Sequence, residues 1–158
     1  MFKVNDLVIH NREGLSRISA INSMNGKDYF LVNICRNSDE NYYVPVETAD
    51  RIIRPLMDAK TADDLLVYIK SIEKSFNTNT KQRRDAYKRL LSSGEVKDIA
   101  YLYKQLYFYN RENEGVIKLG PVDLEMLSYA KDMLMDELAI SYNIKREEIE
   151  RFVEGKIS

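Results

Sequence analysis

The first 56 residues alternate apolar and polar side chains with the period of two that is typical of β-strands. Five strands are predicted in this part, at residues 2–9, 15–21, 29–34, 42–46 and 51–54. The Asn25-Gly26 pair indicates a tight hairpin, and the polar run 36–41 is expected to be a loop. Pro45 places the fourth strand at an edge or at a strand end. Short strands joined by tight turns predict a small, strongly bent sheet or SH3-like barrel.

After residue 60 the apolar period changes to 3.6, which is typical of helices. A helix is expected to start at Thr61, with Leu65, Ile69, Ile72 and Phe76 on its inner face. A basic helix follows over 80–91. The string 92–95 reads as a capping box before a third helix, whose expected core positions are Val96, Ile99, Ala100, Tyr103, Leu106 and Tyr107. A long helix begins at Pro121, with Met126, Ala130, Met133, Leu134 and Leu138 expected to face inwards, and a last one covers 145–153.

These elements predict an α+β protein with a small β-barrel at residues 1–57 and a compact all-α domain at residues 61–158. The composition, with 44% hydrophobic and 31% charged residues, suits an ordinary soluble globular protein. The only cysteine, Cys35, excludes an intramolecular disulfide and is expected to be buried within its apolar run. No signal-like leader and no apolar run long enough for a membrane span is present, so a cytoplasmic protein is expected.

Charge is distributed unevenly although the net charge is only −1. Residues 1–57 are neutral, residues 70–91 carry a net charge of +5, and residues 111–158 carry −4. In a helix, Lys81, Arg84 and Lys88 share one face. A cationic helix behind the polar lead-in 77–80, which reads as a hinge, could bind a phosphate backbone, and an ordinary solvated basic face is the alternative.

No catalytic constellation is visible. His10 is the sole histidine, so neither a histidine-paired nucleophile with a spare base nor a multi-histidine metal site can be assembled. No glycine-rich phosphate loop exists. The adjacent acids 63–64 and 147–148 are explained by the dipoles of the helices that they begin. We therefore expect a protein that is not an enzyme and that holds no metal or cofactor.

Two further surfaces are candidates for partner binding. Tyr101 and Phe108 are expected to point outwards from the third helix, where they could stack on nucleic acid. On the barrel, the hairpin tip and the last part of the fourth strand could bind a protein that adds a strand or packs against exposed side chains. The barrel candidates are Ser23, Met24, Asn25, Tyr43 and Pro45.

Several strings resemble the CarD/CdnL family of bacterial RNA polymerase-binding transcription regulators. Residues 1–8 look like the family's Phe-Lys-Val-Gly-Asp-x-Val-Val opening, and the barrel is also similar to the polymerase-interacting domain of the transcription-repair coupling factor. Further matches in order and spacing are Gly14, Arg17, Ile18, Ala20, Ile21, the strings 43–46, 49–50 and 54–56, and in the helical part the strings 81–83, 93–96 and 137–139. The resemblance covers nearly the whole chain, to about Tyr142.

The resemblance implies a Tudor-like barrel that docks on the lobe of the polymerase β subunit. It also implies a helical domain that contacts promoter DNA at the upstream edge of the melted bubble, where a tryptophan wedge stabilises the open complex. The implied DNA-binding residues are Thr80, Lys81, Arg83, Arg84 and Lys88, the contact is non-specific, and the chain is expected to be monomeric.

The family's Trp-x-x-Arg-Tyr-Lys string aligns with residues 80–85, so Thr80 stands at the wedge position and Asp85 replaces a base. The acidic string 123–125 stands where the family usually carries Lys or Arg, residues 11–14 replace a Pro-x-His-Gly turn, and Tyr43 replaces an arginine. Two other functions stay open: a protein–protein adaptor on the polymerase without DNA contact, and a small enzyme of unrecognised type.

Overall fold

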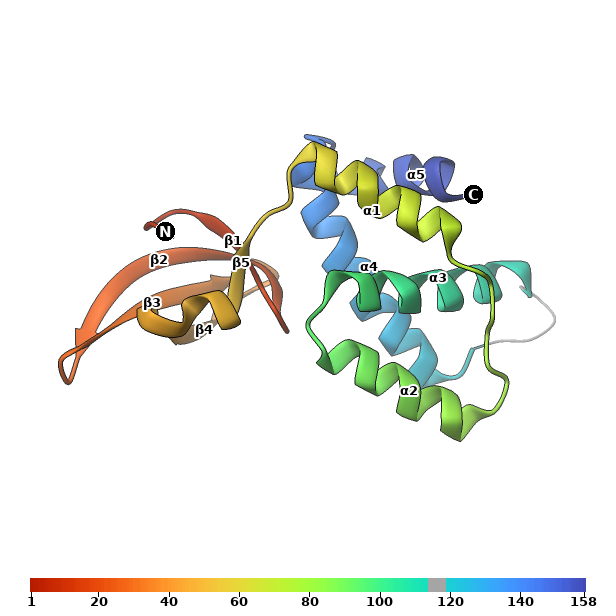
Figure 1. Cartoon of the computed structure of the whole chain (residues 1–158), viewed down its shortest axis with the longest axis horizontal. Helices are drawn as coiled ribbons and strands as arrows, with labels where there is room; N and C mark the ends of the chain where they lie inside the picture. The colour runs from red at the N-terminus through yellow and green to blue at the C-terminus, as the bar shows by residue number, and fades with distance from the viewer. Residues whose placement is uncertain (114–118) are drawn as a thin grey trace. The chain divides into compact units, whose positions relative to one another are not determined.

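The computed structural model describes residues 1–113 and 119–158 and divides into two units, Met1–Met57 and Asp58–Ser158 (Figure 1). The first unit is an antiparallel sheet and the second is built of helices, which confirms the α+β fold. Within the described ranges, no helix has the length and apolarity needed to cross a membrane.

The five strands of the first unit are β1 (Leu7–His10), β2 (Gly14–Met24), β3 (Lys27–Ile34), β4 (Asn37–Pro45) and β5 (Ile53–Pro55), with a 3-10 helix η1 (Val46–Arg51) before β5. They form one sheet in the order β4-β3-β2-β1-β5, and every pairing is antiparallel. Asn25 and Gly26 connect β2 to β3 with φ angles of 52° and 77°. Positive φ at both turn residues suits a type I′ hairpin, as predicted from the Asn-Gly pair.

The predicted loop at residues 36–41 is wrong, because most of this polar run belongs to β4. Asn41 pairs with Asn33, and Asn37 pairs with Ile34 across an irregularity in the register. Since β4 lies at the edge of the sheet and this part of it is exposed, polar side chains are compatible with a strand there. Pro45 ends β4, in agreement with the expectation for that proline.

The core of the sheet unit is made by inward-facing residues of the strands, Val8, Ile18, Phe30, Val32, Val44 and Ile53, together with Ala49 of η1. His10 stabilises the tight β1–β2 turn, because its Nδ1 accepts hydrogen bonds from the backbone N–H groups of Arg12 (3.2 Å) and Glu13 (3.1 Å). The imidazole ring also packs on Tyr42, at 5.0 Å between ring centroids. Burial lowers the pKa of His10 from its ordinary value.

Cys35 is exposed, so the expectation of a buried thiol is wrong. The alternation of β3 places Ile34 in the core, and the chain turns away from the sheet at the next residue. The apolar neighbours of Cys35 in the sequence are therefore core residues, while Cys35 itself follows the end of the strand.

The helices of the second unit are α1 (Ala59–Ser71), α2 (Thr80–Ser92), α3 (Val96–Glu112), α4 (Pro121–Ser141) and α5 (Arg146–Ile157). The first begins before the predicted Thr61, since the side chain of Asp58 caps it by accepting from Thr61 N at 2.8 Å. It ends at Ser71, so Ile72 and Phe76 do not belong to it. The acids 63–64 consequently lie beyond the first turn of α1, whereas 147–148 occupy the first turn of α5.

Helix α3 is buried on most of its circumference because it contacts α1, α2 and α4. Leu102, Gln105 and Phe108 are buried in addition to the predicted Ile99, Ala100, Tyr103 and Leu106, while Val96 and Tyr107 are half-buried. The expectation of an outward Phe108 is therefore wrong. In α4 the predicted Met133 is half-buried, and Met135 is fully buried.

Candidate nucleic-acid interface

Helix α2, which carries the five predicted DNA-binding residues, is fixed to the domain by two buried side chains, Arg83 and Tyr87. Its N-terminus is capped by Asn79, whose side chain accepts from Gln82 N at 3.0 Å. Burial raises the pKa of Tyr87 to about 12, so its hydroxyl stays neutral in the interior. The N-terminus of a capped helix carries a partial positive charge, which favours anions near Thr80 and Lys81.

Arg83 does not lie on the surface. Its Nη2 is 2.7 Å and its Nε 3.1 Å from the two carboxylate oxygens of Asp123, and the two side chains are only 7% and 2% exposed. This bidentate hydrogen bonding raises the pKa of Arg83 above its ordinary value. Arg83 also donates to Asn77 O at 2.9 Å. The expectation that Arg83 contacts phosphate is therefore corrected: its charge is compensated inside the domain, where it joins α2 to the start of α4.

The segment 72–76, which precedes the predicted hinge at residues 77–80, is anchored to α3 and α2. The buried Gln105 accepts from Ser75 N at 2.7 Å and donates to Glu73 O at 2.7 Å. Phe76 stacks on Tyr109 at 3.6 Å between centroids, with the guanidinium of Arg83 at 4.7 Å from its ring centre. Residues 77–80 are exposed, but Thr80 already belongs to α2, the side chain of Asn79 caps this helix, and Asn77 O accepts from Arg83.

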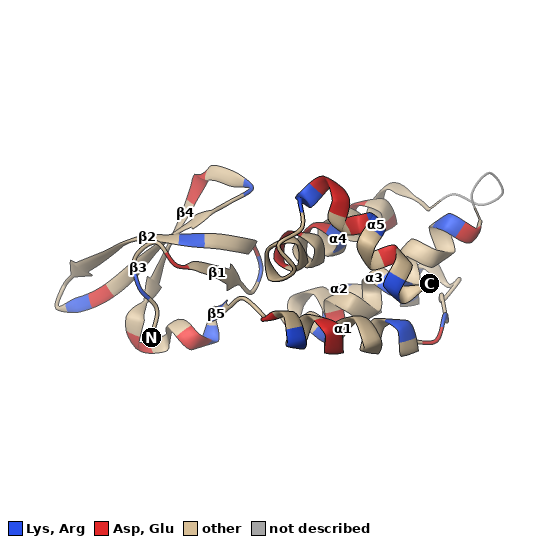
Figure 2. Ribbon diagram, turned by 90° about the horizontal axis from the view of Figure 1, so that it is seen from above, with Lys and Arg blue, Asp and Glu red and all other residues tan. Residues whose placement is uncertain are grey.

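The solvent-facing side of α2 keeps a smaller set of charges than the sequence suggested. Lys81, Lys88 and Arg89 are exposed, with the acid Asp85 between them. Arg84 is half-buried. Its guanidinium lies close to Gly120 at the start of α4: Nη2 is 3.5 Å from the position that a Cβ on this glycine would occupy. Basic and acidic residues alternate elsewhere in the domain too, for example along α1 (Figure 2). The exposed face of α2 thus carries a modest net positive charge.

Thr80 is exposed at the first position of α2, one residue before Lys81. A threonine is too small to fill an unstacked base step, so this helix start can contact phosphates and cannot act as an aromatic wedge. Of the suspected tyrosines, Tyr101 is half-buried and its hydroxyl lies 3.3 Å from Ser75 Oγ.

The structure gathers the predicted polymerase-binding residues at two places in the sheet unit. Ser23, Met24 and Asn25 form the exposed tip of the β2–β3 hairpin, where Met24 is 38% exposed. Tyr43, 53% exposed, and Pro45 lie on the edge strand β4. Ile21 on β2, which sequence reasoning did not single out, is 48% exposed and adds a third apolar side chain.

Sequence reasoning missed three buried polar residues, namely Lys104, Gln105 and Asp123: Asp123 bonds to Arg83 of α2, and Gln105 bonds to the segment before this helix. Lys104 donates to Ile69 O at 2.9 Å, which satisfies a carbonyl at the end of α1. Nothing in their spacing identified them, since a polar residue in a helical pattern is normally placed outside. The only available signal was the string 123–125, where acids stand in place of bases.

Among the described residues, no group of three or more His, Cys, Asp and Glu side chains could hold a metal ion. The chain was then compared with known proteins. The family model for the CarD C-terminal domain matches residues 64–154, and that for the CarD-like/TRCF RID domain matches residues 2–57. The search of curated proteins found no significant match. Because two models of the same kind of regulator cover both units in order, the chain belongs to the CarD-like family of RNA polymerase-interacting transcription regulators.

Proposed function

We propose that this protein docks on the β subunit of RNA polymerase through its sheet unit and contacts promoter DNA non-specifically through α2, and that it does so in the cytoplasm without catalysing a reaction. The observation that supports this best is the anchored helix α2, which exposes Lys81 in its first turn and Lys88 two turns further along the same face. Contacts of this kind go to phosphates and position a protein without reading base sequence. The contact modulates the stability of the open complex.

The DNA part is tested by the salt dependence of binding. The full chain is titrated with a forked duplex at roughly 50 to 200 mM salt, and the slope of log affinity against log salt is measured. Lys81→Glu/Lys88→Glu is expected to lower the magnitude of the slope by about 2, one unit for each lost phosphate contact. Lys60→Glu/Lys145→Glu changes the net charge equally at two exposed positions outside α2, one in α1 and one at the N-cap of α5, and is the matched control. Equal losses in both variants would contradict the assignment to α2.

The same helix start gives a prediction about the missing wedge. Thr80→Trp is expected to raise the preference for forked over closed duplex by about tenfold, because stacking an aromatic side chain on a base contributes roughly 1–3 kcal/mol. Thr80 is exposed at the beginning of α2, so the larger side chain has room. Thr80→Ala should leave the preference unchanged. If Thr80→Trp also leaves it unchanged, this position does not lie at the fork.

Polymerase docking is tested by co-purification of the full chain with the isolated β subunit. Met24→Ser/Tyr43→Ser removes two exposed large side chains among the predicted contacts and is expected to abolish recovery, whereas Val122→Ser/Leu124→Ser removes two exposed apolar side chains of α4 and should not. Equal recovery of wild type and Met24→Ser/Tyr43→Ser would argue against this docking surface.

A second candidate function is a protein–protein adaptor on the polymerase that makes no DNA contact. It is favoured by the burial of Arg83 and by the exposed Asp85, which together reduce the positive charge available on α2. Cross-linking on an assembled promoter complex separates the two functions. The adaptor predicts no DNA adducts from residues 80–89, and the DNA-contacting regulator predicts adducts near Lys81.

A further inference from the structure

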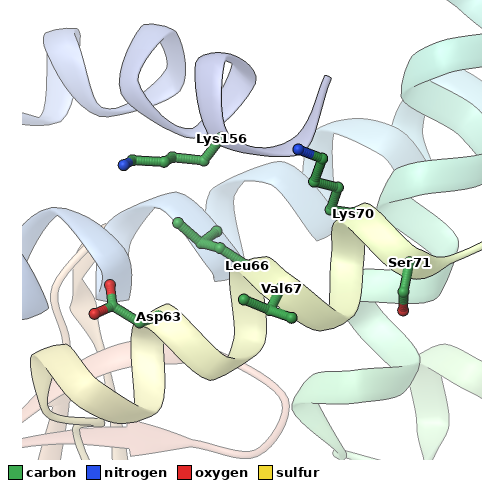
Figure 3. A pocket seen from close by; sticks show the side chains of 6 residues that line it. All are labelled: Asp63, Leu66, Val67, Lys70, Ser71 and Lys156. Atoms are coloured by element: carbon green, nitrogen blue, oxygen red, sulfur yellow. The ribbon is translucent and has the colours of Figure 1, made fainter.

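A groove between α1 and α5 is not used by the function proposed above. It has a volume of about 530 Å³, and it is lined by Asp63, Leu66, Val67, Lys70, Ser71 and Lys156. Figure 3 shows α1 and α5 side by side, with the side chains of Leu66, Lys70 and Lys156 between the two helices. Neither the aromatic residues of α3 nor the exposed face of α2 contributes to it.

The base of the groove is apolar and accessible. Leu66 is buried at its floor with 4% exposure, and Val67 beside it is 70% exposed. No other large apolar side chain in the described part of the helical domain exceeds 45% exposure. An exposed aliphatic side chain next to a concave surface offers a place for an apolar anchor of a partner.

The charged side chains of the groove are arranged for an acidic partner. Lys70 extends from α1 and Lys156 from α5, so cations are presented from both walls (Figure 3). Both lysines lie in the last turns of their helices, where the helix dipoles favour a cation, but this does not explain the apolar floor between them. The only acid in the lining, Asp63, accepts a hydrogen bond of 2.6 Å from the hydroxyl of Tyr142.

We propose that this groove binds a short acidic segment of a second protein, with an apolar side chain on Leu66 and Val67 and carboxylates on Lys70 and Lys156. The lining from Asp63 to Ser71 spans about 12 Å along α1, which corresponds to two helical turns or to about four extended residues of a partner. A short segment with one or two apolar anchors and flanking acids is therefore sufficient to fill it.

A protein segment fits this groove better than nucleic acid does. A phosphate backbone requires a row of cations and gains nothing from an aliphatic floor, whereas two cations around an apolar base suit an amphipathic acidic peptide. The two lysines would select the partner and increase its association rate.

The test is a selection with a library of short random peptides on the immobilised full chain, depleted on the Lys70→Glu/Lys156→Glu variant. The expected result is enrichment of peptides in which Asp or Glu flanks a Leu, Ile or Phe. A labelled synthetic peptide of the enriched sequence should bind Lys70→Glu/Lys156→Glu at least about tenfold more weakly than wild type, and Val67→Ser several-fold more weakly. Lys60→Glu/Lys145→Glu should change its affinity by no more than about twofold.

All substituted side chains are exposed, and circular dichroism of each variant verifies that it is folded. The proposal is overturned if no enriched peptide depends on Lys70 and Lys156, or if the control variant loses as much affinity. It is also overturned if Val67→Ser does not change the affinity for the peptide, because binding would then depend on charge alone and the lysines would bind any polyanion. Competition by a forked duplex would assign the groove to DNA, and a concentration-dependent dimer lost in Lys70→Glu/Lys156→Glu would assign it to a second copy of the chain.

Discussion

At the scale of single residues, the ion pair of Arg83 and Asp123 decides what the basic helix can do. Arg83 looks like one more surface cation in the sequence, yet both of its hydrogen-bonding edges face partners within the domain. A buried charge must be compensated, and Asp123 at the start of α4 supplies the compensation. Asp123, which the sequence shows only as one acid of the string 123–125, is therefore the partner of Arg83.

Removing one member of this pair is expected to destabilise the fold strongly, whereas removing both members is expected to destabilise it much less. Arg83→Met is expected to lower the free energy of unfolding by about 3–5 kcal/mol, because it leaves Asp123 charged and buried. Urea denaturation of the full chain, followed by circular dichroism, measures the change. Arg83→Met/Asp123→Leu should recover most of the loss, and a double variant as unstable as the sum of the two single ones would disprove the compensation.

His10 makes the stability of the sheet unit depend on pH. Its Nδ1 accepts two backbone hydrogen bonds, which a protonated nitrogen cannot do, and burial lowers its pKa in the folded state. The groups that face it are Arg12 and Glu13 of its own turn and Tyr42 of β4. Because the unfolded chain takes up a proton near pH 6.5 and the folded chain only at lower pH, stability is complete above pH 6.5 and decreases as the pH falls below it.

Since His10 is the only histidine, its titration is readily isolated. We expect the unfolding free energy of the full chain, measured in urea, to fall between about pH 7 and pH 5. The amide signals of Arg12 and Glu13 should lose protection from exchange over the same range. His10→Asn retains an acceptor without titrating, so its stability should be nearly flat there. A wild type that is equally flat would contradict the role given to His10.

At the scale of elements, α2 is held in place by its own buried side chains, Arg83 and Tyr87, and by the anchored segment that precedes it. The segment 72–79 has no regular structure, but Gln105 pairs with it twice and Phe76 is enclosed by Tyr109 and Arg83. A cationic helix mounted on a fixed segment keeps its charges in a constant position, which lowers the entropy lost on binding.

Replacing Gln105 tests whether the segment before α2 is held in place by its hydrogen bonds to this side chain. Gln105→Leu conserves the approximate volume but leaves Ser75 N and Glu73 O without their partner, and the expected loss of stability is about 2 kcal/mol. Hydrogen exchange of the Ser75 amide should accelerate with it. Gln82→Leu, on the exposed side of α2, is the control and should change neither quantity. Unchanged exchange at Ser75 in Gln105→Leu would mean that other contacts hold the segment.

At the scale of the whole molecule, the chain divides into two units, each with a core of its own: one around Phe30 and Val32, the other around α3. Units of this kind fold alone when their cores do not depend on each other. A fragment of residues 58–158 is therefore expected to unfold cooperatively on heating, with amide NMR signals that overlay those of the full chain. Widespread shifts throughout this fragment would show that its core depends on the sheet unit.

The sequence by itself determined the order of the five strands and five α-helices, because period-two and period-3.6 patterns reflect which face of each element is buried, but it missed the 3-10 helix η1 and the first half of β4. It also determined the Asn25-Gly26 turn, since few residues tolerate positive φ. Tertiary structure alone decided which polar residues are inside. Arg83, Gln105 and Lys104 are buried because partners far along the chain satisfy them, and no local pattern records such partners. For the same reason, α1 ends at Ser71 where Lys104 meets its last carbonyls, and α3 is buried on sides that its own periodicity leaves polar.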